Sequence, residues 1–267
     1  MYPSGLVGMA HNPSPAARVK PVLAYELFAG DPKARYDWIL KNATAIEYTP
    51  NPLDLDSARY QANPFLELGI PVRFHTRYPG WELGSADRLQ AEEAFKKHAR
   101  TLDLIAGMGE PFVTIHLGLN PLIELDPDRA EANLCRLVDH AATKGISICL
   151  ENLRAGLASE PENILAWAEA SGCSITLDVG HALSSEVVAQ GAYSMQDIVD
   201  MFSPRLAEVH IYGKEDERGH HPITDMEAMA PVLEQLLNTG CNWWTIELKD
   251  TFQALETKQQ LLDRICL

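Results

Sequence analysis

The amino-acid sequence predicts a single α/β domain folded as a closed (β/α)8 barrel. Strand-like and helix-like segments alternate eight times between residue 21 and the end of this 267-residue chain, without an obvious linker. Six of the apolar, β-branched runs end in His, Asp or Glu. Strands that alternate with helices indicate a parallel sheet, and eight such units fit a closed barrel. The polar endings would then converge, because the carboxyl ends of barrel strands share one face.

The first half of the chain contains four of the predicted strand–helix units. The expected strands are 21–28, 43–49, 70–76 and 111–116, and the expected helices are 31–41, 55–68, 91–109 and 126–144. The strand segments are apolar and β-branched, which is typical of buried strands. Asp31 is typical of a helix cap, and Gly69, Gly109 and Gly145 are typical of residues that follow a helix.

The second half repeats the pattern. The expected strands are 146–152, 174–178, 206–212 and 243–248, and the expected helices are 161–170, 195–202, 225–238 and 252–265. A doubly wound open sheet is the competing architecture, but it usually carries a Gly-rich turn after its first strand, and Phe28-Ala29-Gly30-Asp31 is not one. A single (β/α)8 TIM barrel over residues 21–267 is therefore predicted, after an irregular lead-in at residues 1–20.

Composition narrows the class of partner. Acidic residues outnumber basic ones 37 to 22, for a net charge of −15. Proteins that bind nucleic acid through its phosphates normally have a basic surface, so long duplex DNA is an unfavourable substrate.

No apolar run approaches the roughly 18 residues of a membrane span, and no secretory signal pattern is present. Five cysteines without a Cys-x-x-Cys motif indicate reduced thiols in a cytoplasmic protein rather than a disulfide framework.

Four strand endings have the residue types of a metal site. They are Glu151, Asp178, His210 and Glu247, which end the expected strands five to eight. Burying a carboxylate or imidazole is costly unless it is paired or metal-bound, and this set suits a divalent cation such as Zn²⁺, Mn²⁺ or Mg²⁺. Salt bridges at the barrel rim are the alternative, but few basic residues lie nearby in the sequence. His75 and His116 end strands three and four. They either join Glu151 in a second metal site or contact the substrate.

The loops after strands six and seven supply further polar candidates. His181 follows Asp178 by three residues, and His220 lies in Arg218-Gly219-His220-His221-Pro222-Ile223. His181 with His220 would hold a further metal or bind a substrate oxygen or phosphate. Arg77, Arg218 and His221 are candidates to contact an anionic substrate.

Other residues carry weaker signals. Trp81 lies in a loop on the site face and is a candidate to stack on the substrate, whereas Lys214 is at least as well explained as a solvated charge. Glu47 ends the expected second strand and is equally consistent with a pocket or a structural ion pair. The remaining histidines, His11, His98 and His140, are expected to be ordinary surface residues.

The ordered motifs resemble those of a known superfamily. They are Phe74-His75-Thr76, Ile115-His116-Leu117-Gly118, Leu150-Glu151-Asn152, Leu177-Asp178-Val179-Gly180-His181, Val209-His210-Ile211, His220-His221-Pro222-Ile223 and Ile246-Glu247-Leu248. In type and order they resemble the motifs of the xylose-isomerase-like barrels, which include sugar and sugar-phosphate isomerases and epimerases and the endonuclease IV type of AP endonuclease. The resemblance covers nearly the whole chain from the first strand onward, and its specificity comes from the order of the motifs.

The resemblance implies one to three bound divalent metal ions, commonly Mn, Zn or Mg, and an oligomeric enzyme. By resemblance, the ligands of the isomerase-type metal are Glu151, Asp178, His210 and Glu247, and His75, His116, His181 and His220 match positions that complete a three-zinc cluster in the endonuclease branch. That branch has an Asp two residues before the position of His220, where this chain has Arg218. Because an Arg cannot ligate a cation, a third metal would need Asp216 or His221 instead.

Three hypotheses about function follow. The first is a metal-dependent isomerase or epimerase of a sugar, sugar phosphate or related polyol, in which Glu151 and Glu247 transfer the proton, while His181 and Arg218 hold a substrate oxygen or phosphate. The second is a multinuclear-zinc phosphodiester hydrolase acting on a small or nucleotide-like substrate. The third is a non-catalytic metal-binding barrel. One bound Mn or Mg favours the first, two or three Zn favour the second, and a barrel that stays empty when metals are supplied favours a binding role.

Overall fold

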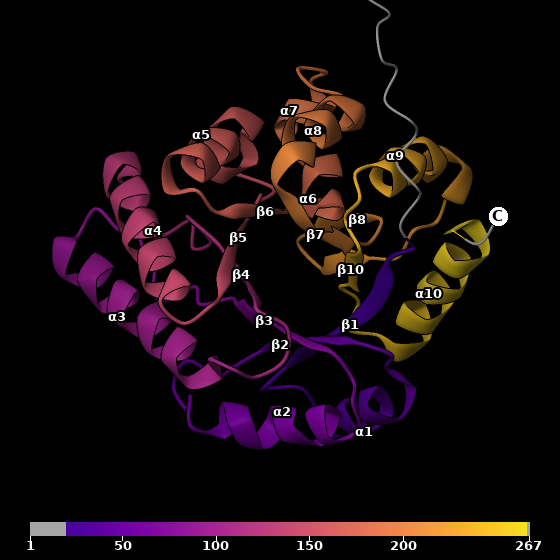
Figure 1. Cartoon of the computed structure of the whole chain (residues 1–267). Coiled ribbons are helices and arrows are strands. Elements are labelled where there is room, and N and C mark those ends of the chain that lie inside the picture. Colours follow the sequence, from indigo (N-terminus) through magenta and orange to yellow (C-terminus); the bar gives the residue numbers. More distant parts are fainter. Residues whose placement is uncertain (1–19, 266–267) are drawn as a thin grey trace, which may run out of the picture.

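The computed structural model describes residues 20–265 and forms a closed barrel of eight parallel strands inside a ring of helices (Figure 1). The barrel strands are β1 (Val22–Phe28), β2 (Ile46–Thr49), β3 (Val72–Thr76), β4 (Phe112–Ile115), β5 (Ser147–Glu151), β6 (Ser174–Asp178), β7 (Leu206–Ile211) and β10 (Trp243–Ile246). Each pairs in parallel with its neighbours, and β1 closes the barrel against β10. The predicted single (β/α)8 TIM barrel is confirmed. Residues 1–19 of the predicted lead-in lie outside the described residues.

Eight longer helices follow the barrel strands. They are α1 (Lys33–Asn42), α2 (Ser57–Glu67), α3 (Arg88–Ile105), α4 (Pro127–Ala142), α5 (Pro161–Ser171), α8 (Met195–Phe202), α9 (Met226–Asn238) and α10 (Thr251–Ile265). Side chains cap several of them: Asp87 accepts hydrogen bonds from two backbone N–H groups of α3, and Ser194 and Asp197 form a capping box on α8. Helix α3 ends earlier than the predicted Gly109, at Ile105, because the chain turns through Gly107 and Gly109, both with positive φ.

The loops after β6 and β7 contain elements that the periodicity did not predict. Two short helices, α6 (Val179–Leu183) and α7 (Glu186–Ala189), follow β6. A two-stranded antiparallel hairpin of β8 (Lys214–Asp216) and β9 (Gly219–His221) follows β7. Two 3₁₀ turns, Leu157–Ser159 and Ser203–Arg205, complete the secondary structure of the described residues. Both extended loops lie beyond the carboxyl ends of their strands, on the face where barrel active sites are built.

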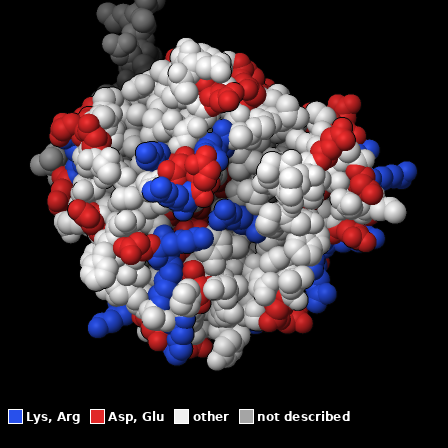
Figure 2. All heavy atoms as spheres, turned by 180° about the vertical axis from the view of Figure 1, so that it is seen from behind, with Lys and Arg blue, Asp and Glu red and all other residues white. Residues whose placement is uncertain are grey.

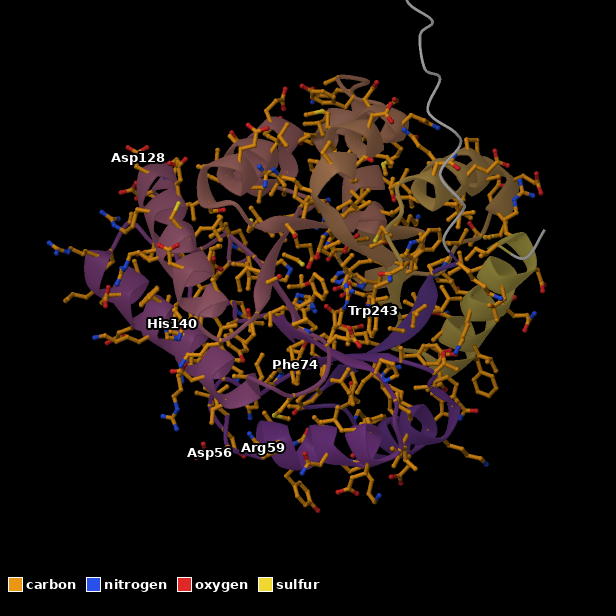
Figure 3. The ribbon with its side chains drawn as sticks, in the orientation of Figure 1. Asp56, Arg59, Phe74, Asp128, His140 and Trp243 are labelled. Atoms are coloured by element: carbon orange, nitrogen blue, oxygen red, sulfur yellow. The ribbon has the colours of Figure 1, made fainter. Side chains whose placement is uncertain are left out.

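The barrel interior is polar, whereas the outer faces of its strands are apolar. Arg73 on β3 reaches across to Glu208 on β7 at 3.2 Å, and the hydroxyls of Thr114 and Thr176 lie 2.8 Å apart. Phe74, between Arg73 and His75 in the sequence, is buried on the side of β3 that faces the helices (Figure 3). Strict alternation of side chains along each strand produces this division. The same alternation directs His75 inward.

The remaining predictions about single residue types have mixed outcomes. Among the described cysteines, Cys149, Cys173 and Cys241 are buried and free, as expected for reduced thiols. His140 lies on α4 in the outer layer of helices, where it pairs with Asp103 of α3 (Figure 3). The prediction that His98 is a surface residue is wrong.

No helix of residues 20–265 is long and apolar enough to span a membrane.

His98 is only 3% exposed because it holds the loop after β3 against α3. One ring nitrogen lies 3.1 Å from the hydroxyl of Thr76, and the other lies 3.2 Å from the backbone oxygen of Trp81. The sequence did not indicate this role, because the spacing of apolar residues along a helix does not show which loop packs against it. The third histidine of this group, His11, lies outside the described residues.

Candidate metal centre

Four buried ligand-type side chains meet at the carboxyl end of the barrel. They are Glu151, the last residue of β5; Asp178, the last residue of β6; His210 on β7; and Glu247, which directly follows β10. One ligand atom of each lies within 4.8 Å of those of the others. Nδ1 of His210 lies 3.1 Å from Oε1 of Glu247 and 3.4 Å from Oε2 of Glu151. The structure therefore brings together all four residues predicted to form the first metal site.

A second group shares Glu151 with the first. Nε2 of His75 lies 3.3 Å from Oε2 of Glu151, and Nε2 of His116 lies 3.0 Å from the same oxygen. The two imidazole rings are 4.8 Å apart, and both are buried. Because one carboxylate faces both groups, Glu151 could supply a ligand atom to either of them.

A third group contains a carboxylate that the sequence analysis did not identify. Glu215 of β8 lies 3.5 Å from Nε2 of His181 and 3.8 Å from Nε2 of His220. Neither of the two expected substitutes takes this place, because Asp216 and His221 pair with each other at 2.8 Å. Arg154 lies 3.2 Å from Glu215, so a cation bound here would have to compete with that guanidinium. Glu215 is paired with His220 across the antiparallel hairpin. The sequence could have identified Glu215 as a neighbour of His220 only if the hairpin had been predicted.

Buried polar atoms without hydrogen-bond partners test whether a cation fits. Among the described residues, such atoms cluster here: both ring nitrogens of His75, Oε2 of Glu151, Nδ1 of His210 and Oε1 of Glu247. A buried polar atom without a partner is costly, and a group of N and O atoms directed at one point is the donor set of a divalent cation. The residues present therefore fit a metal ion.

A layer of hydrogen bonds orients these ligands from behind. The side chain of Asn152 accepts a bond from the backbone N–H of Asp178 at 2.8 Å and donates one to its backbone oxygen at 3.0 Å. The hydroxyl of Tyr212 donates to Oδ2 of Asp178 at 3.1 Å, and its ring stacks on His220 at 4.0 Å between centroids. Such outer contacts fix the direction of metal ligands.

Glu47 lies deeper in the barrel than the sequence indicated. The prediction placed it at the end of the second strand, but it is the second residue of β2 and is fully buried below His210. Its Oε2 lies 3.0 Å from Nε2 of His210 and 3.8 Å from Nδ1 of His75. Glu47 does not line the cavity above the ligands, and it forms a further group of possible ligands with His75, His210 and Glu247, whose ligand atoms lie within 4.8 Å of one another.

The pKa values of the centre are shifted by burial and by neighbouring charges. Burial alone would raise the pKa of Glu151 and of Glu247, but the adjacent histidines, above all His116 and His210 respectively, hold both pKa values well below their usual range. Burial would lower the pKa of His210, yet the carboxylates of Glu247, Glu47 and Glu151 raise it well above its usual value. The two glutamates are thus carboxylates at neutral pH, and a cation must displace the proton of His210.

A cavity of about 280 Å³ opens above the three groups. Its lining includes His75, His116, Glu151, His181, Glu215, His220 and Glu247, together with Arg77, Arg154, Leu119 and Leu153. On the face opposite to that of Figure 1, Lys and Arg side chains gather around a group of Asp and Glu near the middle (Figure 2). The mixture of carboxylates, imidazoles and guanidinium groups suits a small polar or anionic ligand.

Three of the candidate substrate residues do not line this cavity. Arg218 lies on the hairpin and lines a neighbouring cavity. His221 faces Asp216, away from the metal ligands. Trp81 packs against Tyr78, with the ammonium of Lys97 4.9 Å from its ring. Of the predicted substrate residues, only His181 and Arg77 line the cavity above the metal ligands.

Comparison with known proteins identifies related sequences and folds. The family described as "Xylose isomerase-like TIM barrel" matches residues 37–265. An uncharacterized protein of Methanocaldococcus jannaschii is 31% identical over 155 residues, which is 58% of this chain and 67% of that protein. Similar solved structures include the 3-keto-D-glucoside 4-epimerase of E. coli, with 16% identity, TM-score 0.69, and coverage of 93% of this chain and 100% of the other. Endonuclease IV of Thermus thermophilus has 14% identity, TM-score 0.64, and coverage of 92% and 99%.

Proposed function

Because this chain belongs to the xylose isomerase-like TIM barrel family, we propose that it is a divalent-metal-dependent isomerase or epimerase of a sugar, sugar phosphate or related polyol. The observation that carries the proposal is the group of unpartnered ligand atoms of Glu151, His210 and Glu247 beneath a cavity of about 280 Å³. Several solved structures of the same fold are named as sugar epimerases, among them D-psicose 3-epimerase of Clostridium cellulolyticum H10, at 14% identity and TM-score 0.69, over 90% of this chain and 96% of that one.

The proposed chemistry is proton transfer next to a substrate carbonyl. Glu151, Asp178, His210 and Glu247 would hold the ion, which as a Lewis acid makes the neighbouring C–H more acidic. Glu151 and Glu247 both line the cavity. Their pKa values are held low, so both are carboxylates in the free protein. One would take the proton from the substrate C–H, and the other, after taking a proton from solvent, would donate it to the opposite face of the same carbon. His181 would orient a substrate oxygen.

Proton exchange with solvent tests this mechanism. In deuterated water, a substrate turned over by the wild-type enzyme should acquire deuterium at the epimerised carbon. Glu151→Gln and Glu247→Gln should abolish this exchange, whereas Glu256→Gln, an exposed change on α10, should leave it intact. Undiminished exchange in either cavity variant would refute the assigned roles. Metal content measured on the same preparations shows whether a variant lost the ion or only the proton transfer.

A second candidate function is supported by the second and third ligand groups. His75 and His116 both face Oε2 of Glu151, and Glu215 joins His181 and His220, which together offer ligands for more than one cation. A multinuclear-zinc phosphodiester hydrolase would use such a set to neutralise charge on phosphorus. Endonuclease IV shares the fold. Zinc stoichiometry and hydrolysis of bis(p-nitrophenyl) phosphate separate the candidates, because the isomerase needs one ion and does not cleave the diester.

A further inference from the structure

A second cavity of about 230 Å³ adjoins the cavity above the metal ligands. The two share Arg77, Glu215 and His220, so one extended ligand can occupy both. The remaining lining residues of the second cavity come from β1, from the β8–β9 hairpin and from the start of α10: Glu26, Arg218, Gly219, Lys249, Asp250 and Gln253. None of these six is a member of the three ligand groups described above.

Three cationic side chains line this cavity, and two of them have no anionic partner among residues 20–265. The guanidinium of Arg218 and the ammonium of Lys249 make no ion pair or hydrogen bond there. The guanidinium of Arg77 lies 5.8 Å from the ring of Phe28, and although burial alone would lower its pKa, the nearby carboxylates of Glu26 and Glu247 raise that pKa. Most arginines elsewhere in the described chain are paired, as Arg35 is with Asp31. Two unpaired cations beside Arg77 around one small cavity can make charge-assisted hydrogen bonds to an anion.

The acidic residues of the cavity have partners other than Arg218 and Lys249. The carboxylate of Asp250 accepts hydrogen bonds from the backbone N–H groups of Phe252 and Gln253 at the start of α10, and that of Glu215 pairs with Arg154. Glu26 is 2% exposed, and burial, reinforced by Glu247, raises the pKa of its carboxyl well above the usual value.

We propose that this second cavity binds the phosphate group of a phosphorylated substrate, whose polyol part lies at the metal ligands. The proposal rests on the proposed isomerase or epimerase function and narrows its substrate class to sugar or polyol phosphates. A phosphate carries about −1.5 to −2 charge near pH 7 and presents three acceptor oxygens, which matches three cationic side chains better than a single carboxylate does. Arg77, which lines both cavities, would contact the region between the two parts of the substrate.

Binding of inorganic phosphate to the metal-free protein tests the second cavity independently of the proposed proton transfer. The full chain, freed of metal with a chelator, is titrated calorimetrically with inorganic phosphate and with acetate. Arg218→Gln and Lys249→Gln should each weaken phosphate binding by about tenfold or more, because each removes a charge-assisted hydrogen bond. Both side chains are exposed, so the variants should fold. Lys33→Gln, an exposed change on α1 whose partner is Asp37, is the matched control.

The outcomes separate this proposal from the proposed function. Phosphate binding that the two variants weaken and the control does not would support the subsite. Equal phosphate binding by wild type and both variants, or acetate bound as tightly as phosphate, would overturn it. Solvent proton exchange and metal content, measured independently, report on the function, so either conclusion can fail while the other stands.

Discussion

The carboxylate of Glu47 lies 3.0 Å from Nε2 of His210, on the side of the ring opposite to Glu151 and Glu247. This contact directs Nε2 toward Glu47 and leaves Nδ1 facing Glu151 and Glu247. A carboxylate behind a histidine ligand fixes its tautomer and increases its basicity. A residue of the barrel interior, Glu47, thus orients the side chain of His210.

Glu47→Gln should weaken metal binding while the barrel stays folded. The amide keeps the shape of the side chain but replaces one carboxyl oxygen by an NH2 group, which cannot accept a hydrogen bond from His210. Loss of such a contact typically weakens metal affinity by about 10- to 100-fold. Competition with a chromophoric chelator measures the change, and circular dichroism checks the fold. Glu256→Gln serves as the control. Unchanged affinity in Glu47→Gln would show that His210 is oriented by other contacts.

Gly180→Ala should disturb the ligands of both the first and the third group. A Cβ atom at position 180 would lie 2.0 Å from the ring of Tyr212, so the ring must move away from Asp178 and His220. We expect a loss of about 1–3 kcal/mol in the free energy of unfolding, as for other overpacked cores, together with weaker metal binding. Urea denaturation and chelator competition measure the two effects.

Tyr212→Phe is the matched variant for that experiment. It removes only the hydroxyl that donates to Asp178, and it keeps the ring stacked on His220. Its loss of stability should be smaller, about 1 kcal/mol. Gly180→Ala should therefore lower the free energy of unfolding more than Tyr212→Phe does. An equal or smaller loss would show that position 180 does not need glycine to make room for the ring of Tyr212.

The ion pair between Arg73 and Glu208 should respond differently to single and double substitution. Both residues are buried in the barrel, and the guanidinium lies 4.2 Å from the ring of Phe112 and 4.5 Å from that of Trp243. Arg73→Met leaves an uncompensated buried carboxylate, which should cost about 3–5 kcal/mol. Arg73→Met with Glu208→Gln should recover much of the loss. Equal loss in the single and double variants, measured by urea denaturation, would argue against this account.

His98 should make the stability depend on pH. Burial lowers its pKa from 6.5 to about 4, so the unfolded chain binds a proton more readily than the folded protein does. The stabilisation by neutral His98 is therefore complete above pH 6.5, declines as the pH falls toward 4, and levels off below. The gap between the two pKa values corresponds to about 3 kcal/mol.

Comparison with His98→Gln isolates this effect from other titrating groups. The difference in the free energy of unfolding between wild type and the variant should shrink by up to about 3 kcal/mol between pH 7 and pH 4. Urea denaturation at a series of pH values measures it. A difference that stays constant over this range would show that the ring is protonated equally well in both states.

The features that the sequence predicted well are those encoded in contiguous residues. Alternation of strands and helices identified the barrel, and the ends of strands identified Glu151, Asp178, His210 and Glu247 as neighbours, because closure brings together the carboxyl ends of all strands. The ring of ligand-type residues was therefore predictable before their distances were known. Their role as metal ligands stays a prediction.

The features that the sequence missed depend on contacts between distant segments. Glu215 approaches His181 because a hairpin folds back over the barrel, and no periodicity signals that hairpin. His98 resembles any histidine on an amphipathic helix until the loop of Trp81 is placed above it. Glu47 could be assigned to the interior but not to His210, since that pair crosses the barrel between β2 and β7.

The hairpin from Lys214 to His221 supplies Glu215 and His220 to one cavity and Arg218 to the next. It is joined to the barrel only at the ends of one loop, so its sequence can change without altering the eight strands. A relative that exchanged this segment would change the candidate ligands Glu215 and His220 and the basic residue Arg218 in one step. The hairpin is thus a natural unit for grafting between barrels of this family, and a graft is a direct way to transfer specificity.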